Sequence, residues 1–182
     1  MAAVLARGYI QLYTGDGKGK TTAAIGAALR ATQRGLRVAF IQFLKSGYDE
    51  ETIKLIPGIM YRHFGLDFQG NGWCLKTEGK TESPRQVPQL VKDGWCLAKE
   101  FVNSGEYDLI ILDELNVVLF FDLISLEDVL AVLRNKPLQT EIIITGRQAP
   151  EQLREMADLV TDMKEIKHWY TRGVKARVGI EY

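Results

Sequence analysis

The chain has 182 residues, and its 23 Lys and Arg balance its 23 Asp and Glu, so the formal net charge is zero. This length suits one domain over residues 1–182, with a core large enough to need no disulfides. The composition, 46% hydrophobic and 25% charged, is ordinary for a folded protein and argues against intrinsic disorder. The even charge balance argues against a general nucleic-acid-binding surface, so we expect no nucleic-acid partner.

Cysteine content and apolar runs bear on the compartment. Cys74 and Cys96 are too few for a disulfide framework and lie in no C-x-x-C pair, so we expect reduced thiols. Residues 1–10 lack the apolar run of a signal peptide, and the longest apolar stretch, residues 117–121, is too short to cross a bilayer. We therefore expect a cytoplasmic protein with no membrane partner. The basic residues within 164–177 are expected to form a solvated face.

The first third of the chain alternates predicted strands and helices. Residues 9–13 form an expected strand, and a glycine-rich loop then leads into an alanine-rich helix over residues 23–34. A second strand is expected over residues 37–43 and a third over residues 59–64. Residues 65–83 carry four glycines and little periodicity, which predicts a long loop, and loops of this length in a compact domain are usually functional or mobile.

The rest of the chain continues the alternation. A strand over residues 108–113 ends in a carboxylate, and a helix over residues 126–134 has Ser125 as its N-cap. The other expected elements are a helix over 84–102, a strand over 141–146, a helix over 150–156 and a last strand over 176–180. Strands that are apolar on both faces and alternate with helices predict an α/β fold with a parallel sheet covered on both sides.

The glycine-rich loop predicts phosphate binding. Its glycines allow backbone N–H groups to converge on phosphate oxygens, and the following helix adds its positive N-terminal end. Lys20 offers a charge to the phosphate chain, and the Thr21 hydroxyl can bind Mg²⁺. Thr14 stands where the strict pattern G-x-x-x-x-G-K-[ST] has glycine, so a plain glycine-rich turn is the alternative. The predicted ATP-binding residues here are Thr14, Gly15, Asp16, Gly17, Lys18, Gly19, Lys20, Thr21 and Thr22.

An acidic pair, Asp113 and Glu114, follows the strand over residues 108–113. Ligands of open α/β sheets bind at the carboxyl ends of the strands, so either carboxylate can join Thr21 in holding Mg²⁺ or Mn²⁺. Glu114 can alternatively act as a base for water, as in an ATPase. The pair can also simply cap the next helix. Together the loop and the pair predict a P-loop NTPase (RecA-like) three-layer fold with a mainly parallel central sheet.

At this point the sequence resembles the P-loop-type cob(I)alamin adenosyltransferases, also called corrinoid adenosyltransferases. The resemblance begins in the phosphate loop, over residues 13–24, and covers nearly the whole chain. The other similar strings are VAFIQFLK (38–45), LDELN (112–116), SLEDVLAVL (125–133), ITGR (144–147), ADLVTDM (157–163), KH (167–168) and GVKARVGIEY (173–182).

The resemblance implies transfer of the 5′-deoxyadenosyl group of ATP to the cobalt of a reduced corrinoid, with release of triphosphate. ATP is then the co-substrate and the corrinoid the substrate, and the phosphate chain lies reversed relative to other P-loop enzymes. Lys20, Thr21 and Glu114 would form the catalytic group that handles the polyanionic leaving group. Arg30 and Arg147 would add charge near the phosphates, although both can equally be surface charges. The resemblance also implies a homodimer and an electron donor such as a flavoprotein reductase.

The sequence departs from the family in the loop before the central helix. Family members usually carry G-F-T-W there, whereas this chain has Gly72, Trp73, Cys74 and Leu75. In the family the two aromatic residues pack against the corrin, so Trp73 and Leu75 are the expected corrinoid-binding residues. Alternatively, Trp73 folds onto the core.

Two other functions stay open on the residues alone. One is an ordinary P-loop ATPase or kinase that uses Glu114 as base or metal ligand. The other is a non-catalytic, nucleotide-dependent carrier of corrinoid. The absence of a recognisable Ser/His/Asp or Cys/His set agrees with the adenosyltransferase, because the corrinoid itself supplies the nucleophile.

Overall fold

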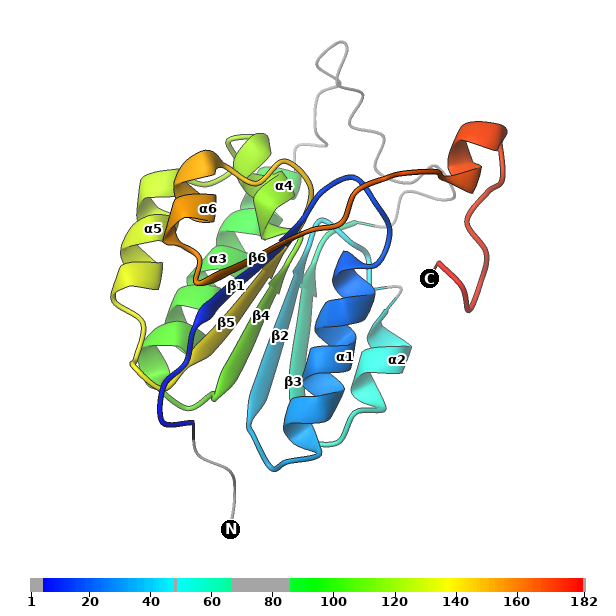
Figure 1. Cartoon of the computed structure of the whole chain (residues 1–182). Coiled ribbons are helices and arrows are strands. Elements are labelled where there is room, and N and C mark those ends of the chain that lie inside the picture. The colour runs from blue at the N-terminus through cyan, green and yellow to red at the C-terminus, as the bar shows by residue number, and fades with distance from the viewer. Residues whose placement is uncertain (1–4, 48, 67–85, 182) are drawn as a thin grey trace.

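The computed structural model describes residues 5–47, 49–66 and 86–181. In these ranges a six-stranded sheet runs through the centre of the molecule, and every pair of neighbouring strands is parallel. The strand order is β3-β2-β4-β5-β1-β6 (Figure 1). The strands are Ile10–Thr14 (β1), Val38–Phe43 (β2), Ile59–Phe64 (β3), Leu109–Asp113 (β4), Glu141–Thr145 (β5) and Leu159–Asp162 (β6).

Helices cover both faces of this sheet (Figure 1). On one face lie Lys20–Thr32 (α1) and Glu50–Lys54 (α2). On the other lie Val87–Ser104 (α3), Leu115–Phe120 (α4), Leu126–Arg134 (α5) and Glu151–Met156 (α6). A 3₁₀ turn, Trp169–Arg172 (η1), lies in the C-terminal segment. Over the residues described, no helix combines the length and apolarity needed to cross a membrane.

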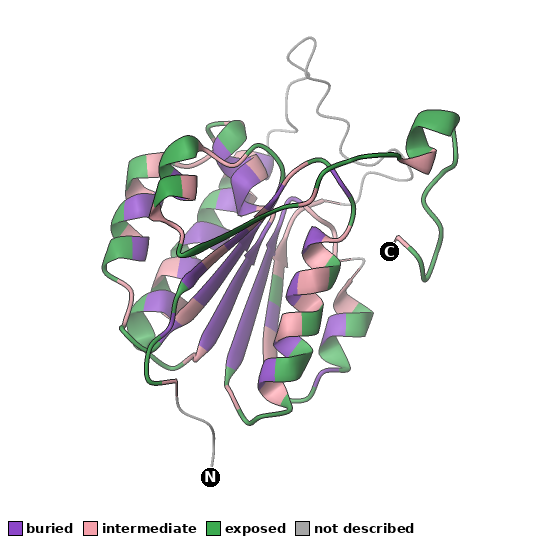
Figure 2. Cartoon of the chain, viewed as in Figure 1, coloured by how far each residue is buried: buried purple, intermediate pink, exposed green. Residues whose placement is uncertain are grey.

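The apolar character of the central strands explains the three layers. β2 and β4 are buried along their whole length, so each supplies side chains to both cores (Figure 2). Toward α1 the core contains Phe40 and Ile111, and α1 meets it with Ala24 and Ala28. Because alanine side chains are short, α1 can lie close to the sheet and keep its N-terminus near the strand ends. The three-layer α/β P-loop fold expected from the sequence is confirmed, with a sheet that is parallel throughout.

Two short helices and one strand differ from the expectations. α2 and α4 have no counterpart among the predicted elements, because five or six residues carry too little periodicity to be recognised. The predicted strand over 176–180 is wrong, since those residues form no strand in the structure. The sixth strand is β6 instead, whose four residues are all exposed. Backbone pairing with β1 holds β6 in the sheet. Such pairing leaves no apolar pattern in the sequence.

The parallel topology brings the two predicted site segments to one edge of the sheet. β1 and β4 are both neighbours of β5, and all three run in the same direction. The phosphate loop follows β1, and the acidic pair closes β4. Segments that are about 100 positions apart in the chain are therefore adjacent in space, as expected for the carboxyl edge of an α/β sheet.

Gly94, inside α3, is a packing requirement that can be tested. A Cβ there would lie 2.8 Å from Phe64 Cγ and 2.9 Å from Phe43 Cε1, both ring atoms of the core. We expect Gly94→Ala to lower the free energy of unfolding by about 1–3 kcal/mol in urea titrations, despite the higher helix propensity of alanine.

Gly26 in α1 is the matched control, because a Cβ there meets nothing within 4 Å. Gly26→Ala should raise the free energy of unfolding by about 0.5–1 kcal/mol. Equal responses of the two variants would contradict the packing role of Gly94.

Candidate functional site

The phosphate loop ends at Gly19, which immediately precedes α1. Gly19 has φ 118°, a left-handed conformation that strongly favours glycine. In the part of the chain that the structure describes, no side chain caps α1, and an α-helix leaves its first N–H groups without acceptors inside the helix. A helix N-terminus with free N–H groups is a natural anion site.

Lys20 lies almost completely buried at the start of α1. Its Nζ donates to Gly15 O at 2.6 Å and to Gly17 O at 2.7 Å, so the ammonium sits in the hollow of the loop. Burial lowers the pKa of Lys20, although the Glu114 carboxylate acts in the opposite direction. Phosphate oxygens in this hollow would replace the two carbonyl oxygens as partners of the ammonium.

Thr21 and Asp113 lie in direct contact, as the sequence predicts for a metal site. Thr21 Oγ1 donates to Asp113 Oδ1 at 2.9 Å. Asp113 is fully buried and also accepts from Thr145 Oγ1 at 2.6 Å and from Gln42 Nε2 at 2.9 Å. Burial opposes ionisation, but the Lys45 ammonium and these donors hold the pKa of Asp113 below its usual value. Asp113 is therefore an ionised and rigidly oriented carboxylate.

The Lys45 ammonium lies among the oxygens expected to bind the metal. Its Nζ is 2.8 Å from Thr21 Oγ1, 2.9 Å from Asp113 Oδ2 and 3.4 Å from Glu114 Oε1. Burial disfavours this charge, but the neighbouring carboxylates outweigh it and raise the pKa of Lys45. Because a cation already occupies this all-oxygen environment, the residues present fit a hard divalent cation such as Mg²⁺.

Phosphate is needed to complete such a metal site. Within the described ranges, no group of three His, Cys, Asp or Glu side chains gathers to hold a metal ion on its own. A hydroxyl and one or two carboxylates fill only part of the coordination sphere of Mg²⁺. Water and phosphate oxygens would fill the rest, as is usual when Mg²⁺ binds together with a nucleotide.

Glu114 adopts a strained backbone conformation at the edge of this group. Its φ is 64°, in the left-handed region that non-glycine residues seldom enter. Its N–H donates to Thr145 Oγ1 at 3.0 Å, which helps to hold the conformation. Glu114 precedes α4 without a side-chain cap bond, so capping does not explain the acidic side chain. Strain of this kind concentrates at functional sites.

Eight of the predicted site residues, Gly17, Lys18, Gly19, Lys20, Thr21, Thr22, Glu114 and Arg147, line a cavity of about 330 Å³ at the N-terminus of α1. Arg147 lies on its wall, and its charge acts on Lys20, so the structure brings this arginine to the loop as expected. The residues that line the cavity are Gly17, Lys18, Gly19, Lys20, Thr21, Thr22, Ile25, Lys45, Asp49, Glu114, Arg147, His168 and Glu181.

The C-terminal segment contacts the phosphate loop directly. Gly17 N donates to Met163 O at 2.6 Å, so this amide, expected to face phosphate, is already bonded within the chain. Lys18 Nζ donates to Ile180 O at 2.8 Å and lies 3.2 Å from Glu181 Oε1. Residues of the segment 163–181 thus contact the phosphate loop and hold it in place.

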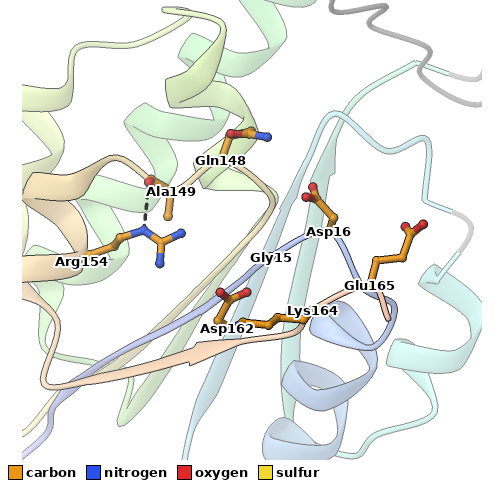
Figure 3. A pocket seen from close by; sticks show the side chains of 8 residues that line it. All are labelled: Gly15, Asp16, Gln148, Ala149, Arg154, Asp162, Lys164 and Glu165. Atoms are coloured by element: carbon orange, nitrogen blue, oxygen red, sulfur yellow. Dashed lines mark hydrogen bonds between the residues drawn. The ribbon is translucent and has the colours of Figure 1, made fainter. Parts of the chain in front are cut away.

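A second cavity, of about 310 Å³, has a different lining (Figure 3). Gly15 and Asp16 line it together with Asp162, Glu165 and Arg154 (Figure 3). This cavity contains neither Lys20 nor Thr21, and three carboxylates surround it. It is therefore a poor match for a triphosphate.

Four expected phosphate-binding residues, Thr14, Gly15, Asp16 and Arg30, do not line the cavity at the N-terminus of α1. Arg30 lies in the last turn of α1, about 15 Å along the helix axis from Lys20, and it is not among the residues that line the cavity, so its role near the phosphates stays a prediction. Because α1 starts at the loop, the residue ten positions after Lys20 lies near the other end of the helix, away from the loop. Thr14 ends β1 fully buried, and its Oγ1 has no hydrogen-bond partner in the part of the chain that the structure describes. Trp73 and Leu75, expected at the corrinoid, lie outside the described residues.

The comparison with protein families shows to which family the chain belongs. A sequence model of the family described as "ATP:corrinoid adenosyltransferase BtuR/CobO/CobP" matches residues 6–182. The chain belongs to this family. As a member it is an enzyme that adenosylates a corrinoid with ATP.

Curated relatives of this adenosyltransferase match over nearly its full length. The corrinoid adenosyltransferase of Escherichia coli (strain K12) is 36% identical over 178 residues, covering 97% of this chain and 86% of that protein. The corrinoid adenosyltransferase of Sinorhizobium sp is 36% identical, with 97% and 81% covered. Corrinoid adenosyltransferase CobA of Salmonella typhimurium is 34% identical, with 97% and 86% covered.

A solved structure supports the fold of this family member. The flagellar accessory protein FlaH from Methanocaldococcus jannaschii superposes with a TM-score of 0.57, covering 87% of this chain and 72% of that one. The sequences are 16% identical, so this likeness bears on the fold alone.

Four further residues of the site were not singled out from the sequence: Gln42, Lys45, Asp49 and Thr145. Gln42 Nε2 donates to both Asp49 Oδ2 and Asp113 Oδ2 at 2.9 Å. Gln42 and Thr145 interrupt apolar strands near their carboxyl ends, and that interruption is the signal that could have identified them. Lys45 follows β2 in irregular chain, and Asp49 directly precedes the short helix α2. No sequence pattern at either position distinguishes these residues from surface charges.

Proposed function

We propose that this enzyme binds the triphosphate of ATP in the cavity at the N-terminus of α1. There Lys20, Arg147 and the free N–H groups of α1 offer positive charge to one polyanion. The phosphate chain is the leaving group, so stabilising it is the principal contribution the protein makes to the rate. The observation that carries the proposal is that Lys20, Thr21, Glu114 and Arg147 line one cavity.

The metal site is a part of this proposal. Thr21, Asp113 and Glu114 would hold Mg²⁺ or Mn²⁺, Thr21 through its hydroxyl and the others through carboxylates. When bound, the metal supplies charge neutralisation to the phosphate oxygens. Asp113 is fixed by Gln42 and Thr145, so it can orient the Thr21 hydroxyl without rearranging.

The proposed reaction is transfer of the 5′-deoxyadenosyl group of ATP to the cobalt of a reduced corrinoid. The cobalt attacks C5′, the bond from C5′ to the phosphate oxygen breaks, and inorganic triphosphate leaves. The chain's own residues bind and orient ATP and stabilise the departing charge. We propose Trp73 and Leu75 as corrinoid contacts on the sequence pattern described above.

We further propose that the enzyme works as a homodimer in the cytoplasm and receives electrons for the corrinoid from a reductase such as a flavoprotein. Support for self-association comes from exposed apolar side chains between residues 159 and 180. They are Leu159, Val160, Ile166, Tyr170, Val174, Val178 and Ile180. Exposed apolar side chains that gather in one stretch of the chain favour such an interaction surface.

Product analysis tests the proposed reaction. The protein is incubated with Mg·ATP and chemically reduced cobalamin, and the cobalamin spectrum is followed together with the phosphate products. We expect a light-sensitive Co–C species and triphosphate in equal amounts. ADP and orthophosphate with an unchanged corrinoid would instead indicate an ordinary ATPase and contradict the proposal.

A further inference from the structure

The Lys45 side chain lies where a metal ion is expected, and its position is well defined. Nζ contacts Thr21 Oγ1 and Asp113 Oδ2 within 2.9 Å, and Glu114 Oε1 and Asp49 Oδ2 lie at 3.4 and 3.9 Å. The first three of these oxygens belong to the proposed metal ligands. Lys45 is therefore not an ordinary surface lysine, since it binds the same oxygens that a divalent cation would use.

Space and charge prevent the ammonium and the metal from sharing these oxygens. Mg²⁺ binds its oxygen ligands at about 2.0–2.1 Å, closer than any Lys45 contact. A divalent ion bonded to Thr21 and Asp113 would lie within a few ångströms of Nζ, where two cations repel strongly in a partly buried setting. One cation must leave before the other can bind.

The structure shows how the ammonium can leave while the backbone stays in place. Lys45 N donates to Phe43 O at 2.8 Å, and Leu44 N donates to Phe64 O at 2.9 Å, so the main chain is bonded on both sides. The Lys45 side chain is 28% exposed and lines the cavity that also contains Lys20 and Arg147. A rotation of this flexible side chain toward the cavity would bring Nζ toward the phosphate chain of a bound nucleotide.

We propose that the Lys45 ammonium occupies the metal position in the nucleotide-free enzyme and is displaced by the divalent cation, so that the metal binds well only together with phosphate. This inference rests on the metal site of the proposed function. It makes Lys45 a positioning residue that keeps Asp113 neutralised until the metal ion arrives, and that then turns to the phosphates. Free metal ions alone bind weakly because they must break the contact between Lys45 and Asp113 without giving the ammonium a new partner.

Direct metal binding tests the proposal without any turnover. Mn²⁺ binding is measured by the loss of the electron paramagnetic resonance signal of free Mn²⁺, first alone and then with inorganic tripolyphosphate. We expect Lys45→Gln to bind Mn²⁺ alone at least about tenfold more tightly than the unchanged chain. With tripolyphosphate present, the difference should shrink. Lys45→Arg retains the charge and should bind Mn²⁺ alone as weakly as the unchanged chain.

Lys54→Gln, which removes an exposed lysine of α2, is the matched control and should leave Mn²⁺ affinity unchanged. Equal Mn²⁺ affinities for the unchanged chain and Lys45→Gln, with clear binding in tripolyphosphate, would overturn the role of Lys45 but leave the proposed function intact. An absence of Mn²⁺ binding to either protein even with tripolyphosphate would overturn the metal site and this inference with it.

A second measurement on the unchanged chain covers the case in which Lys45→Gln fails to fold. The ¹⁵N resonance of the Lys45 ammonium, assigned by its loss in Lys45→Arg, is recorded before and after addition of Mg²⁺ with tripolyphosphate. We expect this resonance to shift or disappear as the ammonium leaves Asp113. An unchanged resonance at saturating Mg²⁺ and tripolyphosphate would overturn the proposal.

Discussion

Replacing Lys20 by alanine should lower the rate of adenosyl transfer by at least about 100-fold, the size of effect seen when one preorganised charge-stabilising donor is lost. Lys20 is the buried ammonium at the base of the loop, and it holds two loop carbonyls that phosphate oxygens would replace. Its loss removes positive charge from the proposed binding site of the triphosphate. The rate is measured from the cobalamin spectrum at saturating ATP, and ATP affinity is measured separately.

Lys54→Ala is the control for this prediction. Lys54 is an exposed cation that pairs with Glu50 on α2 and is absent from the walls of the cavity. It should leave the rate unchanged. A Lys20→Ala protein that folds normally in urea titrations and retains the full rate would show that the phosphate-loop assignment is wrong.

Replacing Asp113 by alanine should have the largest effect on stability in this site, about 3–5 kcal/mol in the free energy of unfolding. The fully buried carboxylate accepts from Thr21, Gln42, Lys45 and Thr145. Its removal leaves several donors without an acceptor, and it leaves the Lys45 charge without its nearest buried counter-charge. Urea unfolding followed by circular dichroism measures the loss.

Glu50→Ala serves as the comparison, because Glu50 pairs with Lys54 and His63 at the surface of the protein. Exposed ion pairs contribute little, so the urea midpoint should hardly move. Equal stability of Asp113→Ala and Glu50→Ala would show that the hydrogen bonds around Asp113 do not stabilise the protein. It would also contradict the fixed orientation of Asp113 on which the proposed metal site depends.

The parts of the structure that could be predicted are those with a local cause. The buried strands β2, β4 and β5 are apolar on both faces, and the glycines before α1 mark a phosphate loop within a few residues. Ser125 was also predictable, since its side chain accepts from Asp128 N at 3.4 Å as an N-cap should. Each of these features depends on residues that lie close together in the sequence, so one sequence is enough to predict it.

The parts that could not be predicted depend on contacts between distant segments. β6 is recognisable only through its pairing with β1, because its own side chains are exposed. Lys45 became part of the site because β2 and β4 pair in a register that puts Gln42 opposite Asp113. The distance of Arg30 from the loop likewise follows only from the length of α1, which puts Arg30 in the last turn of that helix.

The position of β1 in the sheet has a consequence for how the protein is made. β1 and its loop precede in the chain the two strands that flank β1, which are β5 and β6, and they also precede Met163, the acceptor of the Gly17 amide. All three are synthesised long after the loop. The proposed nucleotide site therefore assembles only after residues 141–163 have been synthesised, and ATP can stabilise the protein only once these residues have joined β1 and its loop.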